Sequence, residues 1–217
     1  MARILITSGP TRQYLDPVRY LTNASSGRMG VALAEAALQR GHEVVVISGP
    51  VSVDYPAAAK VIHVVTTTEM LEVTSREFQT ADGLIGAAAP CDYMPTHVES
   101  QKMSKTGHGL HLELVETPDI VATIGAAKSK SQWVVGFALE TEDIRFRAIV
   151  KMSRKCCDMI VSNSADAMNS ESNSVEVILK DGEIVGQFQG TKQQVAHDIM
   201  GLIQAHLISP SQSGTAS

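Results

Sequence analysis

Polar and charged side chains gather in one stretch near the start of the chain, SGPTRQYLDPVRYLTNASSGRMG, which spans residues 8–30. The stretch carries three arginines, whose guanidinium groups suit carboxylate and phosphate. A polar set also stands directly before a helix-like segment: Asn23, Ser25, Ser26 and Gly27. Side-chain and backbone donors at the start of a helix can converge on an anion. The stretch therefore predicts a local anion site.

Each of these residues also has a purely structural interpretation. Ser25 or Ser26 could cap the helix, and Asp16 could form a turn before Pro17. The length of the connection argues for more, because a strand-to-helix loop usually needs about 2–6 residues and this one has roughly three times as many. Loops of such length are usually functional, so we interpret the cluster as a binding or catalytic loop.

Apolar runs that alternate with helix-like segments place this loop in a β-α-β unit. A strand over 3–8, a helix over 27–40 and a strand over 43–48 form the first unit. Continuous apolar runs then follow, as in strands buried on both faces of a parallel sheet: 61–65, 83–89, 133–138 and 158–163. The long loop thus lies at the carboxyl edge of the strands, where phosphate ligands meet helix N-termini.

The remaining segments carry antiparallel and helical signals. Leucines alternate with polar residues over 109–116, which predicts an antiparallel strand, and Thr117 is expected to cap the helix that follows. A hairpin is expected to turn at Asp181 and Gly182. Apolar residues at helical spacing predict a last helix within 191–208.

A dinucleotide-binding domain is the first alternative for a loop at this position. Gly9, Gly27 and Gly30 do not form the G-x-G-x-x-G pattern, however. The second strand ends in ISGP, without an acidic residue for a ribose hydroxyl. Both observations argue against an NAD(P)-dependent reductase, which remains the alternative enzyme class. A nucleotide-binding module without enzymatic activity is a third possibility.

Composition and charge limit the function classes. The chain has 217 residues, 44% of them hydrophobic and 19% charged, which is ordinary for a globular protein with one sizeable core. A net charge of −5 gives no general attraction to nucleic acid or to an anionic membrane. No apolar stretch approaches the roughly 20 residues of a membrane span, and no signal peptide is evident, so we expect a soluble cytoplasmic protein.

Domain organisation and cysteine usage are simple. We expect one domain over 1–208 and a disordered polar tail over 209–217. The three cysteines, Cys91, Cys156 and Cys157, contain no C-x-x-C pair, and two of them are adjacent. This arrangement suits neither a disulfide framework nor a zinc site, so we expect reduced thiols.

Residues 9–30 closely resemble the signature of phosphopantothenoylcysteine synthetase, an enzyme family of coenzyme A biosynthesis that is often fused in bacteria to a flavin-dependent decarboxylase. Three later segments extend the resemblance: AAAPCDYMP at 87–95, SQKMSK at 100–105 and VVGFALET at 134–141. The match runs from about residue 4 to residue 207 and lacks the decarboxylase half, so the chain looks like a stand-alone synthetase.

The chain departs from the family pattern at two places. Ser104 stands at the third position of the family's K-x-K-K flap, where the family has a lysine, which puts one phosphate contact in doubt. The connection before the terminal hairpin lacks the usual glycine-phenylalanine pair. Asn163 and Asn173 in that region could bind a ligand or could only form turns.

The resemblance implies a Rossmann-like three-layer α/β sandwich with a mainly parallel sheet and an antiparallel flap or hairpin. It implies a ligase that joins 4'-phosphopantothenate to L-cysteine through an acyl-nucleotide formed from CTP, with ATP as the alternative, with Mg²⁺ and without flavin. The metal ligands are unknown from sequence. A homodimer is implied, and a separate phosphopantothenoylcysteine decarboxylase is a possible functional partner. Neither nucleic acid nor a membrane is expected as a partner.

The same resemblance implies roles for individual residues. Asn23 and Lys102 would be catalytic, with Asn23 orienting the acyl-nucleotide and Lys102 stabilising its phosphate. Asp16, Arg19 and Asn23 would contact phosphopantothenate. The nucleotide would be bound by Gly9, Ser25, Ser26, Gly27, Ala89, Asp92, Lys102, Lys105 and Phe137. For Phe137, packing in the core and packing on the base are equally open.

Overall fold

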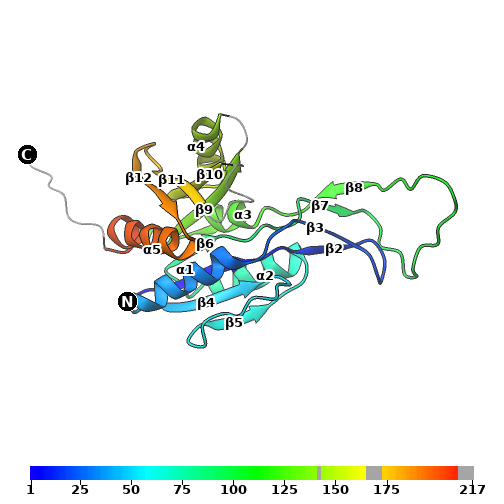
Figure 1. Ribbon diagram of the computed structural model, residues 1–217, viewed down its shortest axis with the longest axis horizontal. Coiled ribbons are helices and arrows are strands. Elements are labelled where there is room, and N and C mark those ends of the chain that lie inside the picture. The colour runs from blue at the N-terminus through cyan, green and yellow to red at the C-terminus, as the bar shows by residue number, and fades with distance from the viewer. Residues whose placement is uncertain (141–142, 165–172, 210–217) are drawn as a thin grey trace, which may run out of the picture.

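A computed structural model describes residues 1–140, 143–164 and 173–209. Its centre is an eight-stranded sheet with the order β12-β11-β10-β9-β6-β1-β4-β5 (Figure 1). The strands of this sheet are β1 (Arg3–Ser8), β4 (Glu43–Ser48), β5 (Lys60–His63), β6 (Gly83–Gly86), β9 (Trp133–Glu140), β10 (Met159–Ser164), β11 (Asn173–Leu179) and β12 (Ile184–Gly190). The six strands from β10 to β5 pair in parallel, which confirms the predicted mainly parallel sheet.

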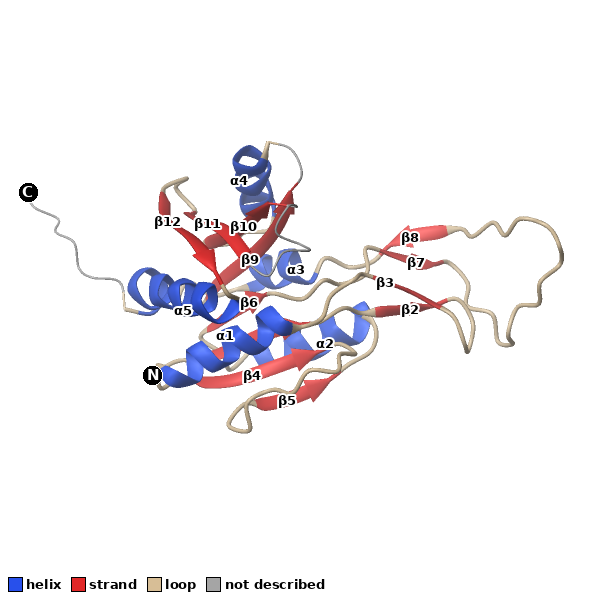
Figure 2. Cartoon of the chain, viewed as in Figure 1, coloured by secondary structure: helices blue, strands red, loops and turns tan. Residues whose placement is uncertain are grey.

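Helices cover both faces of the sheet (Figure 2). They are α1 (Arg28–Gln39), α2 (Thr67–Phe78), α3 (Ile120–Ala127), α4 (Ile144–Arg154) and α5 (Lys192–Ile203), which continues into a π-helix (Gln204–Ile208). Buried residues of α1 and α5 form one core with the sheet, and buried residues of α2, α3 and α4 form the other. The expected three-layer sandwich is therefore confirmed.

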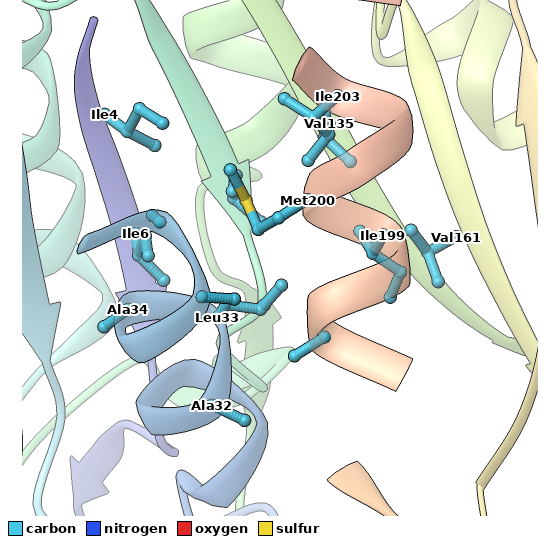
Figure 3. Packing of buried hydrophobic residues seen from close by; sticks show 14 of the residues in the cluster. Ile4, Ile6, Ala32, Leu33, Ala34, Val135, Val161, Ile199, Met200 and Ile203 are labelled. Carbon is cyan, nitrogen blue, oxygen red and sulfur yellow. The ribbon is translucent and has the colours of Figure 1, made fainter. Parts of the chain in front are cut away.

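Side chains alternate between the two cores along each strand. On β1, Ile4 and Ile6 join the α1 and α5 side, whereas Leu5 joins the opposite side. Figure 3 shows Ile6 close to Leu33 of α1, with Met200 of α5 nearby. These residues are fully buried. Burying an aliphatic side chain of this size contributes about 1.5–3 kcal/mol, so the cores hold the strand ends in place.

The chain reverses direction across the sheet between β1 and β6. From β1 the chain crosses through α1 to β4 and β5, and then returns through α2, on the other face, to β6. Ligands of open α/β sheets bind outside the carboxyl ends of the strands at such a switch point. The long loop after β1 and the turn after β6 both leave the sheet there.

Two small hairpins form an arm that projects from the carboxyl edge (Figure 1). They are β2 (Arg12–Tyr14) with β3 (Tyr20–Thr22), inside the long first loop, and β7 (Tyr93–Pro95) with β8 (Leu114–Glu116). The predicted strand over 109–116 is wrong for its first half, since only β8 is paired and Leu110 and Leu112 are exposed.

The N-cap of α3 differs from the expected one. Thr117 does not cap α3, because the side chain of Asp119 accepts the Ala122 N–H while the Thr117 hydroxyl donates to the Cys91 carbonyl oxygen.

The hairpin at Asp181 and Gly182 is confirmed, and it joins the main sheet as antiparallel β11 and β12. Of the predicted tail, residues 210–217 lie outside the described residues.

Candidate functional site

The loop after β1 is joined to the turn after β6 by its backbone. Gly9 adopts a left-handed conformation with φ of 75°. Its carbonyl oxygen accepts the Ala89 N–H at 2.9 Å, and Pro10 forms a parallel bridge with Ala89. A Cβ on Gly9 would lie 2.7 Å from the side chain of Val51, so the turn also requires a small residue. Two predicted nucleotide residues, Gly9 and Ala89, are thereby brought together.

Asn23 connects the far end of the same loop to the same turn. Its amide Nδ2 donates to the Pro90 carbonyl oxygen at 2.8 Å and to Asp92 Oδ2 at 3.3 Å. The Cys91 N–H donates to the buried Thr11 hydroxyl at 2.8 Å, which adds a third tie between loop and turn. Asn23 and Asp92 are thus neighbours although they are 69 positions apart in sequence.

The start of α1 offers backbone N–H groups at the same edge. Gly27 is the N-cap, with φ of 75°, and no side chain among the described residues caps the helix there. The interpretation of Ser25 or Ser26 as an N-cap is therefore wrong. Uncapped N–H groups at a helix start, next to the positive end of the helix dipole, favour an anion.

A chain of hydroxyl groups holds this helix start against the sheet. The Tyr55 hydroxyl donates to Ser8 Oγ at 2.8 Å, and Ser8 Oγ donates to the Gly27 carbonyl oxygen at 3.3 Å. Gly30 leaves the room that this contact needs, because a Cβ there would lie 2.0 Å from Ser8 Oγ. Neither Tyr55 nor Ser8 was singled out from the sequence, since their partners are distant along the chain.

A cavity of about 410 Å³ opens beside the Asn23 contact. Of the predicted residues, Asp92 and the half-buried Phe137 line the cavity, and Phe137 also packs partly against the core. Sequence reasoning missed most of the other wall, which comes from the start of α3 and the end of α4: Pro118, Asp119, Ile120, Val121, Arg154 and Lys155. Lys155 Nζ pairs with Asp119 Oδ2 at 3.1 Å, so the cavity has a cation at its rim.

The flap, defined here as residues 96–113, carries the two predicted lysines. Lys102 and Lys105 are both exposed, and neither forms a hydrogen bond or ion pair with another described residue. Their ammonium groups are therefore not brought into contact with Asn23 or Asp92. Ser104 between them is exposed as well.

Asp16 and Arg19 form an ion pair whose arginine side chain remains 40% exposed. Asp16 is fully buried, and its Oδ1 accepts the N–H groups of Val18 and Arg19 at 2.8 Å each, so the turn-forming interpretation is confirmed. Arg19 donates from Nε and Nη2 to Asp16 Oδ2, at 2.9 and 2.6 Å. Burial alone would raise the pKa of the Asp16 carboxyl, but these hydrogen bonds outweigh it and hold the pKa well below its usual range.

Other titratable groups offer little further chemistry. Cys91 and Cys157 are buried, Cys156 is exposed, and all three are free cysteines. Burial raises the pKa of Cys157 to about 12, so this thiol stays protonated. Asn163 is the next-to-last residue of β10, and its Oδ1 is buried without a partner among the described residues. The side chain of Asn173 lies outside them.

The described part of the chain has neither a cluster of metal ligands nor a helix that could cross a membrane. No group of three or more His, Cys, Asp or Glu side chains is arranged to hold a metal ion. None of the helices there combines the length and the apolar character that a membrane span requires.

Known proteins resemble this chain along nearly its whole length. The family model described as "DNA/pantothenate metabolism flavoprotein C-terminal domain" matches residues 1–207. The coenzyme A biosynthesis bifunctional protein CoaBC of Bacillus subtilis is 44% identical over 184 residues, which is 82% of this chain and 45% of that protein. The chain therefore spans about half the length of this relative.

Solved structures share the fold. The crystal structure of the C-terminal domain of CoaBC is 38% identical, covers 94% of both chains and has a TM-score of 0.80. A Cab2 mutant in complex with phosphopantothenate-cysteine is 14% identical, covers 93% of this chain and 86% of its own, and has a TM-score of 0.74. The second likeness supports the fold alone.

Proposed function

We propose that this chain, which belongs to the DNA/pantothenate metabolism flavoprotein C-terminal domain family, is a phosphopantothenate–cysteine ligase. In the first step the carboxylate of phosphopantothenate attacks the α-phosphorus of a nucleoside triphosphate, and pyrophosphate leaves. In the second step the amine of L-cysteine attacks the acyl carbon of the acyl-nucleotide. The C–O bond breaks, the nucleoside monophosphate leaves, and the amine loses a proton as the amide forms.

The observation that carries this proposal is the contact of Asn23 with the turn after β6. Asn23 Nδ2 holds Pro90 and Asp92 at the switch point of the sheet, where a nucleotide is expected. A dinucleotide loop needs glycines at this position rather than a bridging amide. The reductase alternative finds no support in the relatives either, since the family members found are coenzyme A biosynthesis proteins.

Acyl-nucleotide formation depends on charge stabilisation. The uncapped start of α1, with Ser25, Ser26 and Gly27, would bind phosphate oxygens through N–H and hydroxyl donors. Negative charge builds on the α-phosphate during attack, and an ammonium group stabilises that charge more in the transition state than in the ground state. We assign this role to Lys102, with Lys105 beside it on the flap.

The cysteine step depends on position. Asn23 would hydrogen-bond the acyl-nucleotide, so that the acyl carbon faces the incoming amine. Its Nδ2 group is oriented by the 2.8 Å hydrogen bond to the Pro90 carbonyl oxygen, and the N–H that donates to Asp92 at 3.3 Å would turn to the acyl-nucleotide instead. This step needs neither a covalent nucleophile nor a shifted pKa. Asp92, Ala89 and Phe137 would then bind the nucleoside, in the cavity that Asp92 and Phe137 line.

CTP is the nucleotide that we propose, because the resemblance is to bacterial family members, which mostly use CTP. Mg²⁺ would enter with the triphosphate and offset its charge. This fits the absence of a cluster of metal ligands among the described residues, since Mg²⁺ usually binds through substrate phosphates and retains several waters. We assign no protein ligand to the metal.

A homodimer is proposed from the arm. Eight large apolar residues are exposed on the two hairpins and the flap, which is an unusual density for a solvated surface. They are Val18, Tyr20, Tyr93, Val98, Leu110, Leu112, Leu114 and Val115. The phosphopantothenate pocket would lie beside this surface, with Arg19 as its cation. Sedimentation at several protein concentrations tests the dimer, and a monomer at all of them would contradict it.

The product is a carboxylate next to an amide and a thiol, so a separate decarboxylase is the proposed functional partner. We place the reaction in the cytoplasm, where nucleoside triphosphates are available.

The test of the function is pyrophosphate release with phosphopantothenate and cysteine, run with CTP and separately with ATP. We expect release with CTP. Binding of CTP without release would instead identify a non-enzymatic module.

A further inference from the structure

The flap contacts the β2–β3 hairpin at two places: the Glu99 N–H donates to the Leu15 carbonyl oxygen at 2.9 Å, and Met103, next to Lys102, makes the second contact. The Met103 N–H donates to Asp16 Oδ2 at 3.1 Å, and the Met103 carbonyl oxygen accepts from Arg19 Nη2 at 2.6 Å. The flap segment 100–112 makes no other hydrogen bond among those of the described residues. Both backbone groups of one residue are therefore engaged by a single carboxylate–guanidinium pair.

This pair is well suited to hold a loop. Asp16 is fully buried, and Oδ2 accepts from Arg19 and from Met103 while Oδ1 accepts the backbone of its own turn. Charge-assisted hydrogen bonds of this kind are roughly twice as strong as neutral ones. The Met103 side chain takes no part, since both contacts use the backbone. The contact joins the β2–β3 hairpin to the flap across 87 positions of sequence.

We propose that Asp16 and Arg19 form a latch that positions Lys102 for the reaction by fixing Met103. Asp16 and Arg19 are positioning residues in this role, because they act through the flap. The latch itself follows from the contacts at Met103, whereas its kinetic consequence rests on the proposed function. Any contact of Arg19 with phosphopantothenate would then be coupled to the placement of the catalytic lysine.

Trypsin offers a direct test, since it cleaves after both flap lysines. The Lys102–Met103 bond lies in the latch, whereas Lys105–Thr106 lies outside it and serves as an internal control. In the unmodified protein we expect the first bond to be cut roughly tenfold more slowly than the second, because both Met103 backbone groups must be released first. Equal rates at the two bonds would overturn the proposal.

Variants separate the latch from general instability. Asp16→Asn should raise the rate at Lys102–Met103 toward that at Lys105–Thr106 and leave the latter unchanged. Met103→Ala, which keeps the backbone contacts, should leave the ratio as it is. If Asp16→Asn also exposes Arg40, directly after α1, to cleavage, the fold has opened, and the Arg19→Lys variant is used for the comparison in its place. If the ratio of the two cleavage rates does not change in the variant that keeps its fold, the latch is contradicted.

A kinetic measurement then tests the consequence for Lys102. In the latch variant, kcat of pyrophosphate release should fall roughly tenfold, while KM for CTP stays within about twofold. A changed cleavage ratio with unchanged kcat would retain the contact but reject its role in positioning. If the unmodified protein releases no pyrophosphate at all, the proposed function fails, and the cleavage ratio still reports on the latch.

Discussion

The carboxyl edge of the sheet and the flap both carry predicted catalytic groups, but they hold them in different ways. At the edge, Gly9, Thr11 and Asn23 are each hydrogen-bonded to the turn after β6, so the donors have a fixed geometry. The flap presents Lys102 and Lys105 on an exposed segment that is anchored at Met103. A group that orients an acyl carbon needs a fixed position, whereas a group that meets developing charge can arrive with the substrate.

Loss of the flap charge should have the largest effect. Lys102→Gln shortens the side chain by one bond, keeps it polar and removes the ammonium, so pyrophosphate release and product formation should both fall by about 10²–10³-fold. Rates of both steps are measured with CTP, phosphopantothenate and cysteine. Lys105→Gln is the matched control and should lose less. Full activity in the Lys102 variant would remove the flap from the mechanism.

A change at the edge should affect one step only. Asn23→Asp keeps the shape but replaces the Nδ2 donor with a carboxylate oxygen, next to Asp92. Acyl-nucleotide formation should continue and the cysteine step should slow by roughly 10²-fold, because orientation is lost. Rapid quench should then find about one equivalent of pyrophosphate per enzyme with little product. Normal product formation beside pyrophosphate release would show that Asn23 is dispensable.

The proposed roles of Lys102 and Asn23 could be inferred from the sequence, but the contacts that hold these parts of the chain in place could not. Periodicity identified the β-α-β unit, the hairpin at Asp181 and the last helix, since these signals are local. The β2–β3 hairpin escaped prediction because its strands have three residues each, too few for a visible alternation. The alternation over 109–116 predicted a longer strand than the one that forms, because those leucines are exposed on the arm instead of being buried on a sheet.

The site shows the same division between local and distant information. The residues of the loop signature could be listed from their types and order. No local pattern indicates that Asp16 contacts Met103, or that Lys155, directly after α4, lines the cavity beside Asp119, because such partners are set by the tertiary fold. The choice of Thr117 over Asp119 as the cap of α3 failed because both residue types are good N-caps.

The carboxyl edge of the sheet should tolerate an added methyl group less well than the flap does. Gly30→Ala places a Cβ against Ser8 Oγ and should cost about 2 kcal/mol of the free energy of unfolding, since overpacking strains α1 against β1. Gly109→Ala on the flap meets nothing within 4 Å and should change stability by less than about 0.5 kcal/mol. Urea unfolding of both variants compares them. Equal midpoints would mean that the edge repacks freely.

The hydroxyl chain behind α1 should contribute the smallest effect. Tyr55→Phe removes the hydrogen bond to Ser8, which in turn contacts Gly27. KM for the nucleotide should rise roughly fivefold, equivalent to about 1 kcal/mol, with kcat little changed. Steady-state kinetics with varied CTP measures both values. A drop in kcat at constant KM would place the hydroxyl in the chemical steps instead.

The acyl-nucleotide intermediate is tested most directly by following one oxygen atom. Phosphopantothenate is labelled with ¹⁸O in its carboxylate and converted with cysteine and CTP, and the nucleotide and phosphate products are examined by mass spectrometry. If the carboxylate attacks the α-phosphorus and cysteine then breaks the C–O bond, one ¹⁸O atom must appear in CMP and none in pyrophosphate. Label in inorganic phosphate, with CDP as the nucleotide product, would contradict the account.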